Sequence, residues 1–316
     1  MRRILATVAV LAMLLASAAC TSGKSTGKPA DTKVEVGVIA IVDVAPIYLG
    51  KAKGFFRKHG IDLDLVPEQG GAPIVKGVLA GKYQFGFSNV TSLMAAQAGG
   101  APLKAVASGA ASTGRSGRDY SAVVVKDGSS IRTPKDLAGK TIAVNALNNI
   151  GDTTVRQSVR KAGGDPKLLK FEAMPFPEMD GALRSGRVDA IWVVEPQLSE
   201  ALTAGAQVLA SNFVDTAPGL TVALYFTSKE TIAKYPQLVA GFTEAIKESL
   251  EYAEQNPDEV RDVVGTYTPI NDTVRIGMIL PDWPQDINRA SLQTVAKLGE
   301  EDGIFKKPPS LDELLP

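Results

Sequence analysis

The sequence predicts an α/β protein of two lobes, each built around a largely parallel sheet. The chain has 316 residues, of which 45% are hydrophobic and 22% charged, which is enough for two cores. From Val34, short apolar runs alternate with amphipathic stretches, as in βα units, and this alternation restarts after about residue 110. Basic and acidic residues are equal at 34 each, so we expect no nucleic-acid partner.

The elements of the first unit follow in order along the chain. We expect strands at 34–41, 62–66, 85–88 and 103–108, separated by helices at 45–58, 73–80 and 91–98 that end at glycines. The alternating segments of the second unit are 133–137, 141–145, 152–162, 171–175, 178–184, 188–194, 197–203 and 207–210. A β-rich run at 220–227 and helical periods at 230–255 and 286–299 complete the chain.

Two segments of the chain resemble each other. Residues 78–85 and 182–189 each place a helix end, a glycine and a basic residue before a strand, with Gly81 aligned on Gly186. Two related lobes explain this echo. The chance recurrence of a common helix-glycine-strand turn explains it as well.

The N-terminus has the pattern of an export signal at 1–19. Arg2 and Arg3 precede sixteen uncharged residues at 4–19, which end in small side chains. This run is shorter than the ~20 residues that usually span a bilayer. We therefore expect export of the protein and removal of the segment.

The single cysteine, Cys20, directly follows Ser17 and two alanines. This arrangement resembles a bacterial lipobox, although leucine usually stands where this chain has Ser17. Residues 20–33 have the composition of a flexible spacer. We expect lipidation at Cys20 and a lipid anchor on the outer face of the cytoplasmic membrane. Ordinary cleavage that leaves a free thiol is the alternative, and a lone cysteine excludes an internal disulfide.

Candidate ligand contacts of the first unit lie in loops that follow strands, where open parallel sheets bind solutes. Asp43 follows the first strand, and Ser88, Asn89 and Thr91 follow the third. Each of these side chains could instead serve only as a helix N-cap.

Candidate contacts of the second unit lie at 145–152 and at the end of an apolar strand. Asn148 belongs to an amide-rich loop that suits a polar solute, or simply a turn. Glu195 ends a strand that also carries Trp192, so it could face a cleft or favour a helix N-terminus.

Catalytic and metal motifs are scarce in the sequence. His59 is the single histidine and Cys20 the single cysteine, which argues against a zinc site or Cys–His catalysis. No Walker-type, GxSxG or GxGxxG segment occurs. We expect a protein that is not an enzyme and needs no cofactor or metal.

Four segments carry a resemblance to a known family. They are DVAPIYLGKAKGFFRKHGIDL at 43–63, GKYQFG at 81–86, DLAGKTIAV at 136–144 and GRVDAIWVVEP at 186–196. In this order they resemble periplasmic-type solute-binding proteins of the nitrate, sulfonate and taurine family, which also includes binders of thiamine pyrimidine precursors. The resemblance implies a small-molecule solute and an ABC importer, with its permease and ATPase, as partners of a monomer.

The resemblance also implies a periplasmic-binding-protein-like fold of type II, with a cleft and two hinge crossovers near 123–126 and 220–226. Lobe 1 would comprise 34–126 plus 221–316, and lobe 2 would comprise 127–220. By position in the motifs, the pocket would use Asp43, Ser88, Asn89, Thr91, Asn148, Trp192, Glu195 and Tyr225.

The charges of these positions favour one class of solute. Asp43 and Glu195 have no lysine or arginine beside them in the sequence, which favours a neutral or amine-bearing heterocycle over nitrate or a sulfonate. An anion held by helix N–H groups remains the alternative. Enzymes of this fold in thiamine or menaquinone biosynthesis are a further alternative, but the chain lacks the pocket histidine and cysteine-rich motif of the fungal thiamine-pyrimidine synthase.

Overall fold

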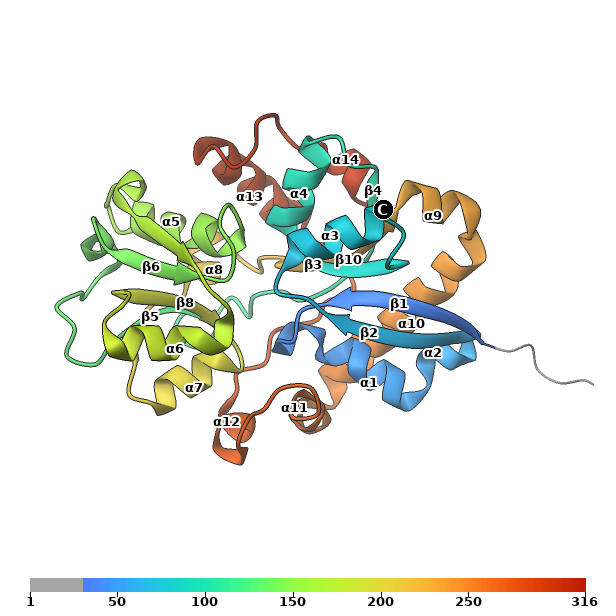
Figure 1. The fold of residues 1–316 in the computed structure, drawn as a ribbon, viewed down its shortest axis with the longest axis horizontal. Coiled ribbons are helices and arrows are strands. Elements are labelled where there is room, and N and C mark those ends of the chain that lie inside the picture. The colour runs from blue at the N-terminus through green and yellow to red at the C-terminus, as the bar shows by residue number, and fades with distance from the viewer. Residues whose placement is uncertain (1–30) are drawn as a thin grey trace, which may run out of the picture. The chain divides into compact units, whose positions relative to one another are not determined.

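The computed structural model describes residues 31–316. The predicted export signal, the lipidation site Cys20 and all but the last residues of the predicted spacer lie outside this range. Two five-stranded sheets organise the described chain, with strand orders β2-β1-β3-β10-β4 and β7-β6-β8-β5-β9. Figure 1 shows the first sheet among the blue, cyan and orange segments and the second among the green and yellow ones.

The first sheet contains the predicted strands of the first unit and one strand from much later in the chain. Its members are β1 (Thr32–Val38), β2 (Ile61–Pro67), β3 (Phe85–Asn89), β4 (Leu103–Ser108) and β10 (Ala223–Ser228). Strand β1 is parallel to β2 and β3, whereas β10 is antiparallel to β3 and β4. The chain thus returns to its first sheet after building the second.

The second sheet repeats this plan. Its members are β5 (Ser121–Val125), β6 (Thr141–Val144), β7 (Lys170–Ala173), β8 (Ala190–Val194) and β9 (Gln207–Ala210). Strand β6 is parallel to β7 and β8, and β5 is antiparallel to β8 and β9. In both sheets the strand that arrives from the other lobe occupies the fourth place. The similar segments 78–85 and 182–189 therefore form equivalent helix-to-strand connections before β3 and β8.

One expectation from the sequence needs correction. Strand β5 pairs with β8 in the second sheet, so the boundary at 126/127 assigned this strand to the wrong lobe. The sheets are mainly parallel, as predicted, and in each of them only the incoming crossover strand runs against its neighbours. The first crossover therefore ends before Ser121, and the second ends before Ala223.

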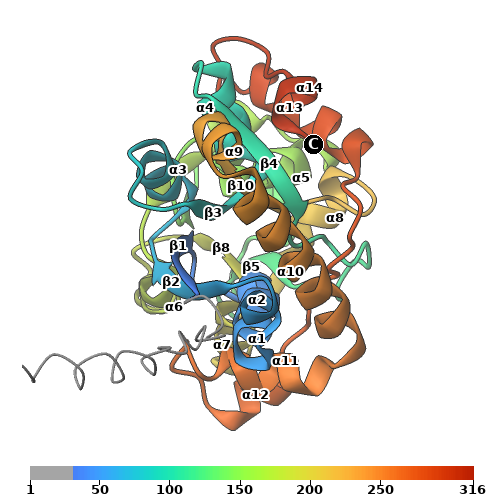
Figure 2. The ribbon, with the colours of Figure 1, turned by 90° about the vertical axis from the view of Figure 1, so that its right-hand side faces the viewer.

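Helices cover both faces of each sheet (Figures 1 and 2). In the first lobe and the C-terminal region they are α1 (Ala45–Lys53), α2 (Phe55–Lys58), α3 (Gly71–Leu79), α4 (Val90–Ala98), α9 (Lys229–Lys234), α10 (Pro236–Gln255), α11 (Pro257–Val264), α12 (Asp272–Gly277), α13 (Arg289–Glu301) and α14 (Leu311–Leu314). In the second lobe they are α5 (Ile150–Lys161), α6 (Phe176–Ser185), α7 (Gln197–Thr203) and α8 (Asn212–Thr216), with 3₁₀ turns at Pro134–Leu137 and Pro166–Leu168.

Close packing joins the C-terminal helix α10 to the first lobe. The rings of Phe85 on β3 and Phe242 on α10 stack with centroids 3.8 Å apart. Gly50 of α1 faces Ser249 of α10 so closely that a Cβ at Gly50 would lie 1.9 Å from the serine hydroxyl. These contacts hold α10 against the first lobe.

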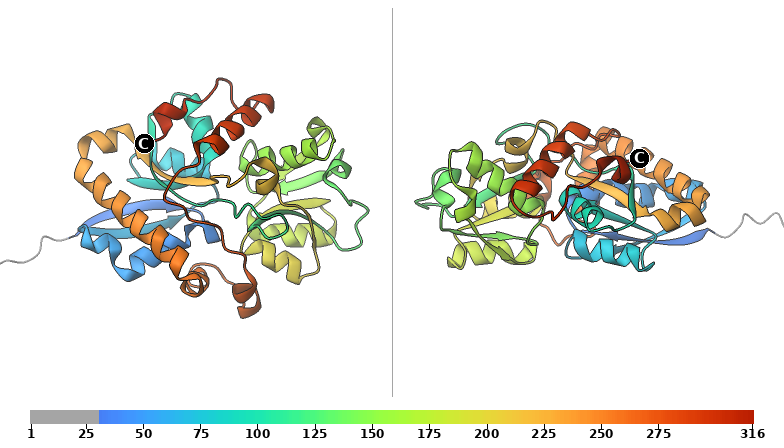
Figure 3. Two further views of the ribbon diagram at one scale, coloured as in Figure 1. Left: turned by 180° about the vertical axis from the view of Figure 1, so that it is seen from behind. Right: turned by 90° about the horizontal axis from the view of Figure 1, so that it is seen from above.

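Three segments cross between the lobes (Figure 3). Ala111 of the first crossover forms bridges to Thr221 of the second and to Asp282 of the C-terminal segment. A C-terminal stretch thus accompanies the two expected crossovers. Among residues 31–316, no helix combines the length and the apolar composition needed to cross a membrane.

Candidate functional site

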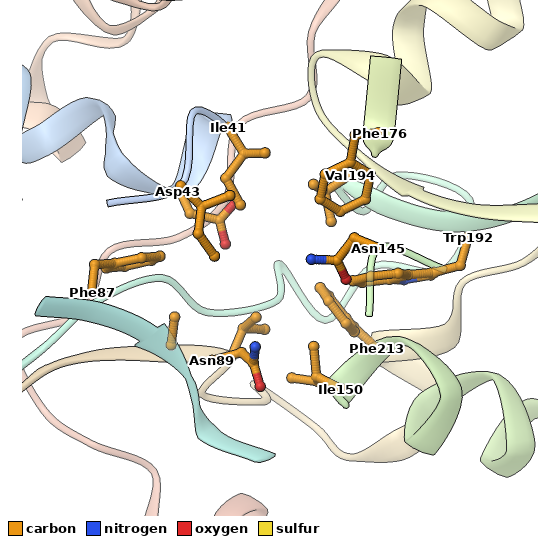
Figure 4. A pocket seen from close by; sticks show the side chains of 13 residues that line it. Ile41, Asp43, Phe87, Asn89, Asn145, Ile150, Phe176, Trp192, Val194 and Phe213 are labelled. Atoms are coloured by element: carbon orange, nitrogen blue, oxygen red, sulfur yellow. The ribbon is translucent and has the colours of Figure 1, made fainter. Parts of the chain in front are cut away.

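A narrow pocket lies where the carboxyl ends of the strands in the two lobes face each other (Figure 4). The cavity between its walls is small, about 20 Å³. Its walls are Ile39, Ile41, Asp43, Phe87, Asn89, Val222 and Ala223 from one lobe, and Asn145, Ile150, Phe176, Trp192, Val194 and Phe213 from the other. A solute therefore requires a small separation of these walls.

The backbone around Asp43 is held by distant parts of the chain. Asp43 lies in a 3₁₀ turn (Val42–Val44) that connects β1 to α1. Trp283 donates its indole N–H to the Asp43 carbonyl at 3.1 Å, and Tyr267 donates its hydroxyl to the Ile41 carbonyl at 3.0 Å. The Val42 N–H donates to the carbonyl of Glu195 across the lobes at 3.0 Å. Both the C-terminal region and the second lobe thus position this turn.

The Asp43 carboxyl group is buried, with 2% of the residue exposed. Tyr120 donates its hydroxyl to Oδ1 at 3.2 Å, and Oδ2 has no hydrogen-bond partner within the described chain. Burial raises the pKa of Asp43 to about 7, although the Tyr120 hydrogen bond acts in the opposite direction. The pocket therefore contains a carboxyl group whose charge the described chain compensates poorly.

Two amide side chains line the pocket from opposite lobes. Asn89 caps α4, and its Oδ1 accepts from the Ser92 N–H at 2.9 Å. Asn145 donates Nδ2 to the Gln69 carbonyl at 3.4 Å, which leaves Oδ1 buried without a partner in the described structure. The free polar atoms at Asp43 and Asn145 are therefore hydrogen-bond acceptors.

Aromatic rings form much of the remaining wall (Figure 4). Trp192 lies between Phe176 and Phe213, with ring centroids 5.5 Å and 6.1 Å away, and Phe87 contributes from the first lobe. The Trp192 indole N–H donates to Ser121 Oγ at 2.9 Å. Such a wall suits a flat apolar body.

Close packing against α5 also supports the Trp192 ring. A Cβ at Gly151 would lie 2.4 Å from the indole. Because no larger residue fits at this position without displacing the ring, Gly151 helps to determine the shape of the pocket.

The structure brings three of the eight sequence-predicted site residues to the pocket lining: Asp43, Asn89 and Trp192. Ser88 and Thr91 are buried behind it, and Asn148 is exposed in the loop before α5, with its N–H bound to Asp152 at 2.7 Å. Tyr225 is fully buried and contacts Phe87 edge-on at 5.2 Å, so it supports the wall from behind.

Glu195 also lies outside the lining, although its sequence context resembles that of Asp43. Its carboxylate accepts from the Ser199 N–H at 3.0 Å and hydroxyl at 2.9 Å, and from the Ile279 N–H at 3.1 Å. Burial raises the pKa of Glu195 to about 7, opposed by these hydrogen bonds. Glu195 thus caps α7 and ties the second lobe to the C-terminal segment.

Most of the apolar lining was missed by sequence reasoning. Phe87, Phe176 and Phe213 occur in ordinary apolar or amphipathic patterns, where core packing is the usual role of phenylalanine. Asn145 belongs to the amide-rich loop that the sequence did single out. In the part of the chain that the structure describes, no group of three or more His, Cys, Asp or Glu side chains could hold a metal ion.

The family model described as "NMT1/THI5 like" matches residues 41–260, more than half of the chain. The chain belongs to the NMT1/THI5-like family. This family agrees with the resemblance seen in the sequence motifs. Over 272 residues the chain is 25% identical to a protein of Bacillus subtilis (strain 168) named for binding aliphatic sulfonates, covering 84% of this chain and 78% of that protein.

Solved structures confirm the two-lobed, type II periplasmic-binding-protein fold of this NMT1/THI5-like protein. The alkanesulfonate-binding protein of Xanthomonas axonopodis pv. citri, bound to MOPS, aligns with a TM-score of 0.77 and 18% identity, covering 92% of this chain and 99% of that one. The nitrate-binding protein of Synechocystis PCC 6803 aligns with a TM-score of 0.74 and 14% identity, covering 91% and 85%. At these identities the likeness concerns the fold.

Proposed function

We propose that the chain is the extracytoplasmic solute-binding protein of an ABC importer and delivers a small organic solute to the permease and its ATPase. Family membership, the two-lobed fold and the pocket between the lobes support this proposal. The relatives named for sulfonate and nitrate binding are solute-binding proteins as well. The protein acts as a monomer that closes on one solute molecule.

The solute is a neutral or amine-bearing heterocycle. The observation that carries this choice is the pocket lining: none of its thirteen described residues is lysine or arginine, and Asp43 is its only acid. An anion about 4 Å from the ionised Asp43 carboxylate would be repelled by roughly 4 kcal/mol at an effective dielectric constant near 20. Aromatic rings suit a flat ring system instead.

A sulfonate- or nitrate-type anion is the second candidate, because α4 and α5 both begin at the pocket wall. Helix N-termini attract anions through free N–H groups. At α5, however, the Asn148 and Asn149 N–H groups donate to Asp152, and the Ile150 N–H donates to the Asn149 side chain. These three donors are already used, which weakens the case for an anion.

A thermal-shift panel on the protein without its predicted signal tests this assignment. The panel contains amines, aminopyrimidines, flavin-like compounds, taurine and nitrate. A ligand at 100 times its dissociation constant stabilises by about 2.7 kcal/mol, which is readily detected. Stabilisation by taurine or nitrate alone would overturn the choice of solute. Mass spectrometry of the recovered ligand tests binding against turnover, since an enzyme would return a changed compound.

We also propose that Cys20 carries the lipid anchor that holds the protein at the outer face of the cytoplasmic membrane. The small residues before Cys20 and the polar residues after it support this assignment. Replacement of Cys20→Ala should release the protein from the membrane fraction. Equal membrane association of the variant and the parent would contradict the anchor.

A further inference from the structure

The two buried polar atoms of the pocket lining that have no partner in the described chain are both hydrogen-bond acceptors, whereas the Asn89 amide nitrogen at the same wall is a donor. Asp43 Oδ2 and Asn145 Oδ1 are buried, belong to residues that line the pocket, and have no partner in the described chain. Figure 4 shows that the two side chains come from opposite lobes and face the gap between them. A bound solute must therefore supply hydrogen-bond donors if these atoms are to be satisfied.

Asp43 also has no positive charge beside it in the pocket wall. Tyr120 supplies one neutral hydrogen bond, and the nearby acid Asp119 adds repulsion rather than compensation. No cationic side chain lines the pocket. A buried carboxylate in these surroundings is costly until a positive charge lies beside it. Below its raised pKa, Asp43 is neutralised by its own proton. Once it is ionised, no protein group in the pocket wall provides a positive charge, so the solute is the remaining source.

We propose that the pocket selects a monocationic solute, in which a protonated nitrogen donates to Asp43 Oδ2 while a flat apolar body lies against the aromatic rings. This inference rests on the proposed solute-binding function and narrows it from neutral or amine-bearing compounds to cations. Asp43 is then the residue that determines charge specificity.

The shape of the pocket indicates which cations would fit best. The walls stand close together, and Phe87 faces the second-lobe rings of Phe176, Trp192 and Phe213 across the gap (Figure 4). A planar cation gains from a face-on approach to such rings as well as from the carboxylate. Amidinium and amino-heterocycle cations combine a planar body with N–H donors, whereas a quaternary ammonium group has no donor for Asp43 Oδ2.

Three probes that share a phenyl ring and differ in charge test the proposal on the protein without its predicted signal. They are benzamidine, a planar cation; benzamide, its neutral counterpart; and benzenesulfonate, an anion. Calorimetric titration at pH 8 gives the affinity for each. We expect benzamidine to bind at least about tenfold more tightly than benzamide, which corresponds to 1.4 kcal/mol, and benzenesulfonate to show no binding.

The variant Asp43→Asn identifies the residue responsible. Asparagine keeps the shape of the side chain and an acceptor for Tyr120 but removes the charge. The preference for benzamidine over benzamide should disappear in this variant, while benzamide binding persists and shows that the pocket is intact. Glu195→Gln is the matched control, since it removes a buried carboxylate that lies outside the lining. In this control the ratio of the two affinities should be unchanged.

The outcomes separate this inference from the proposed function. Equal binding of benzamide and benzamidine by the parent protein overturns the charge inference but leaves a binder of neutral heterocycles. Preferential binding of benzenesulfonate overturns both the inference and the proposed solute class, and leaves an importer of anions. If none of the three probes binds at millimolar concentration, the cation pocket is also refuted. A preference that survives in Asp43→Asn refutes the role of Asp43.

Discussion

Replacement of Asp43→Asn should stabilise the solute-free protein at alkaline pH relative to its effect at acidic pH. Burial raises the pKa of Asp43 from 3.8 to about 7. For an acid whose pKa is raised by folding, stability is fully present below the unfolded pKa and is lost as the pH rises through the folded value. The parent protein therefore loses stability between about pH 4 and pH 7, and the asparagine variant lacks this loss.

The size of this stability difference follows from the shift in the Asp43 pKa. Each pKa unit corresponds to 1.36 kcal/mol, so the shift of Asp43 predicts a relative gain of about 3–4 kcal/mol for the variant between pH 4 and pH 8. Tyr120 and Asp119 face the same carboxyl group, and Tyr225 and Tyr267 lie within reach of its charge. Burial raises the pKa values of the three tyrosines further above their usual range, so they stay neutral from pH 4 to pH 8. Asp119 is present in both proteins, so the comparison removes most of its contribution.

Urea unfolding at pH 4 and pH 8 measures this difference for the parent and the variant. The variant-minus-parent difference in unfolding free energy should become more favourable to the variant as the pH rises. A difference that stays the same at both pH values would show that Asp43 keeps an ordinary pKa, and the argument from burial would fail. Addition of a cationic ligand that binds should narrow the difference, because it restores the missing charge in the parent.

Three further perturbations test the packing and the contacts between the lobes. Gly151→Ala should lower stability by about 1–3 kcal/mol and weaken ligand binding, because the added Cβ would meet the ring of Trp192. Gly181→Ala, where the added Cβ would have no atom within 4 Å, should instead stabilise its helix by up to about 1 kcal/mol. Thermal unfolding compares the two variants, and equal effects would argue against the close contact at Gly151. Arg160→Ala leaves the buried carboxylate of Asp302, the residue that directly follows α13, without its partner on α5. Urea unfolding should then show a loss of stability of about 2 kcal/mol or more, and no loss would mean that this bridge between the lobes is unimportant. Tyr120→Phe removes the hydroxyl group that donates to the Asp43 carboxylate. Urea unfolding should show a loss of stability of about 1–3 kcal/mol at pH 8, where Asp43 is ionised, and a smaller loss at pH 4. An equal loss at both pH values would assign the effect to packing.

Local sequence patterns predicted much of the fold. The strand at 103–108, the helix at 197–203 and the strand at 207–210 have the predicted ends, because apolar runs and glycine stops mark them clearly. Strand β5 was misassigned for a physical reason. Its run SAVVV is buried throughout and shows no alternation, so nothing local indicates which sheet it joins.

The sequence could not distinguish the roles of Asp43 and Glu195. Both acids follow an apolar strand and precede a helix that has a proline in its first turn, and the sequence alone therefore placed both at the ligand. The tertiary structure distinguishes them: Ile279, 84 residues away, and Ser199 occupy the oxygens of Glu195, while Asp43 Oδ2 remains free at the pocket.

The sequence by itself determined the alternating elements, the two-lobed α/β fold and the family, because these depend on local periodicity and contiguous motifs. Only the tertiary structure decided which acid lines the pocket and which aromatic rings form its walls. The physical reason is that the partners of a buried polar group come from segments far apart in the chain, and their meeting depends on how the sheets, crossovers and C-terminal segment pack.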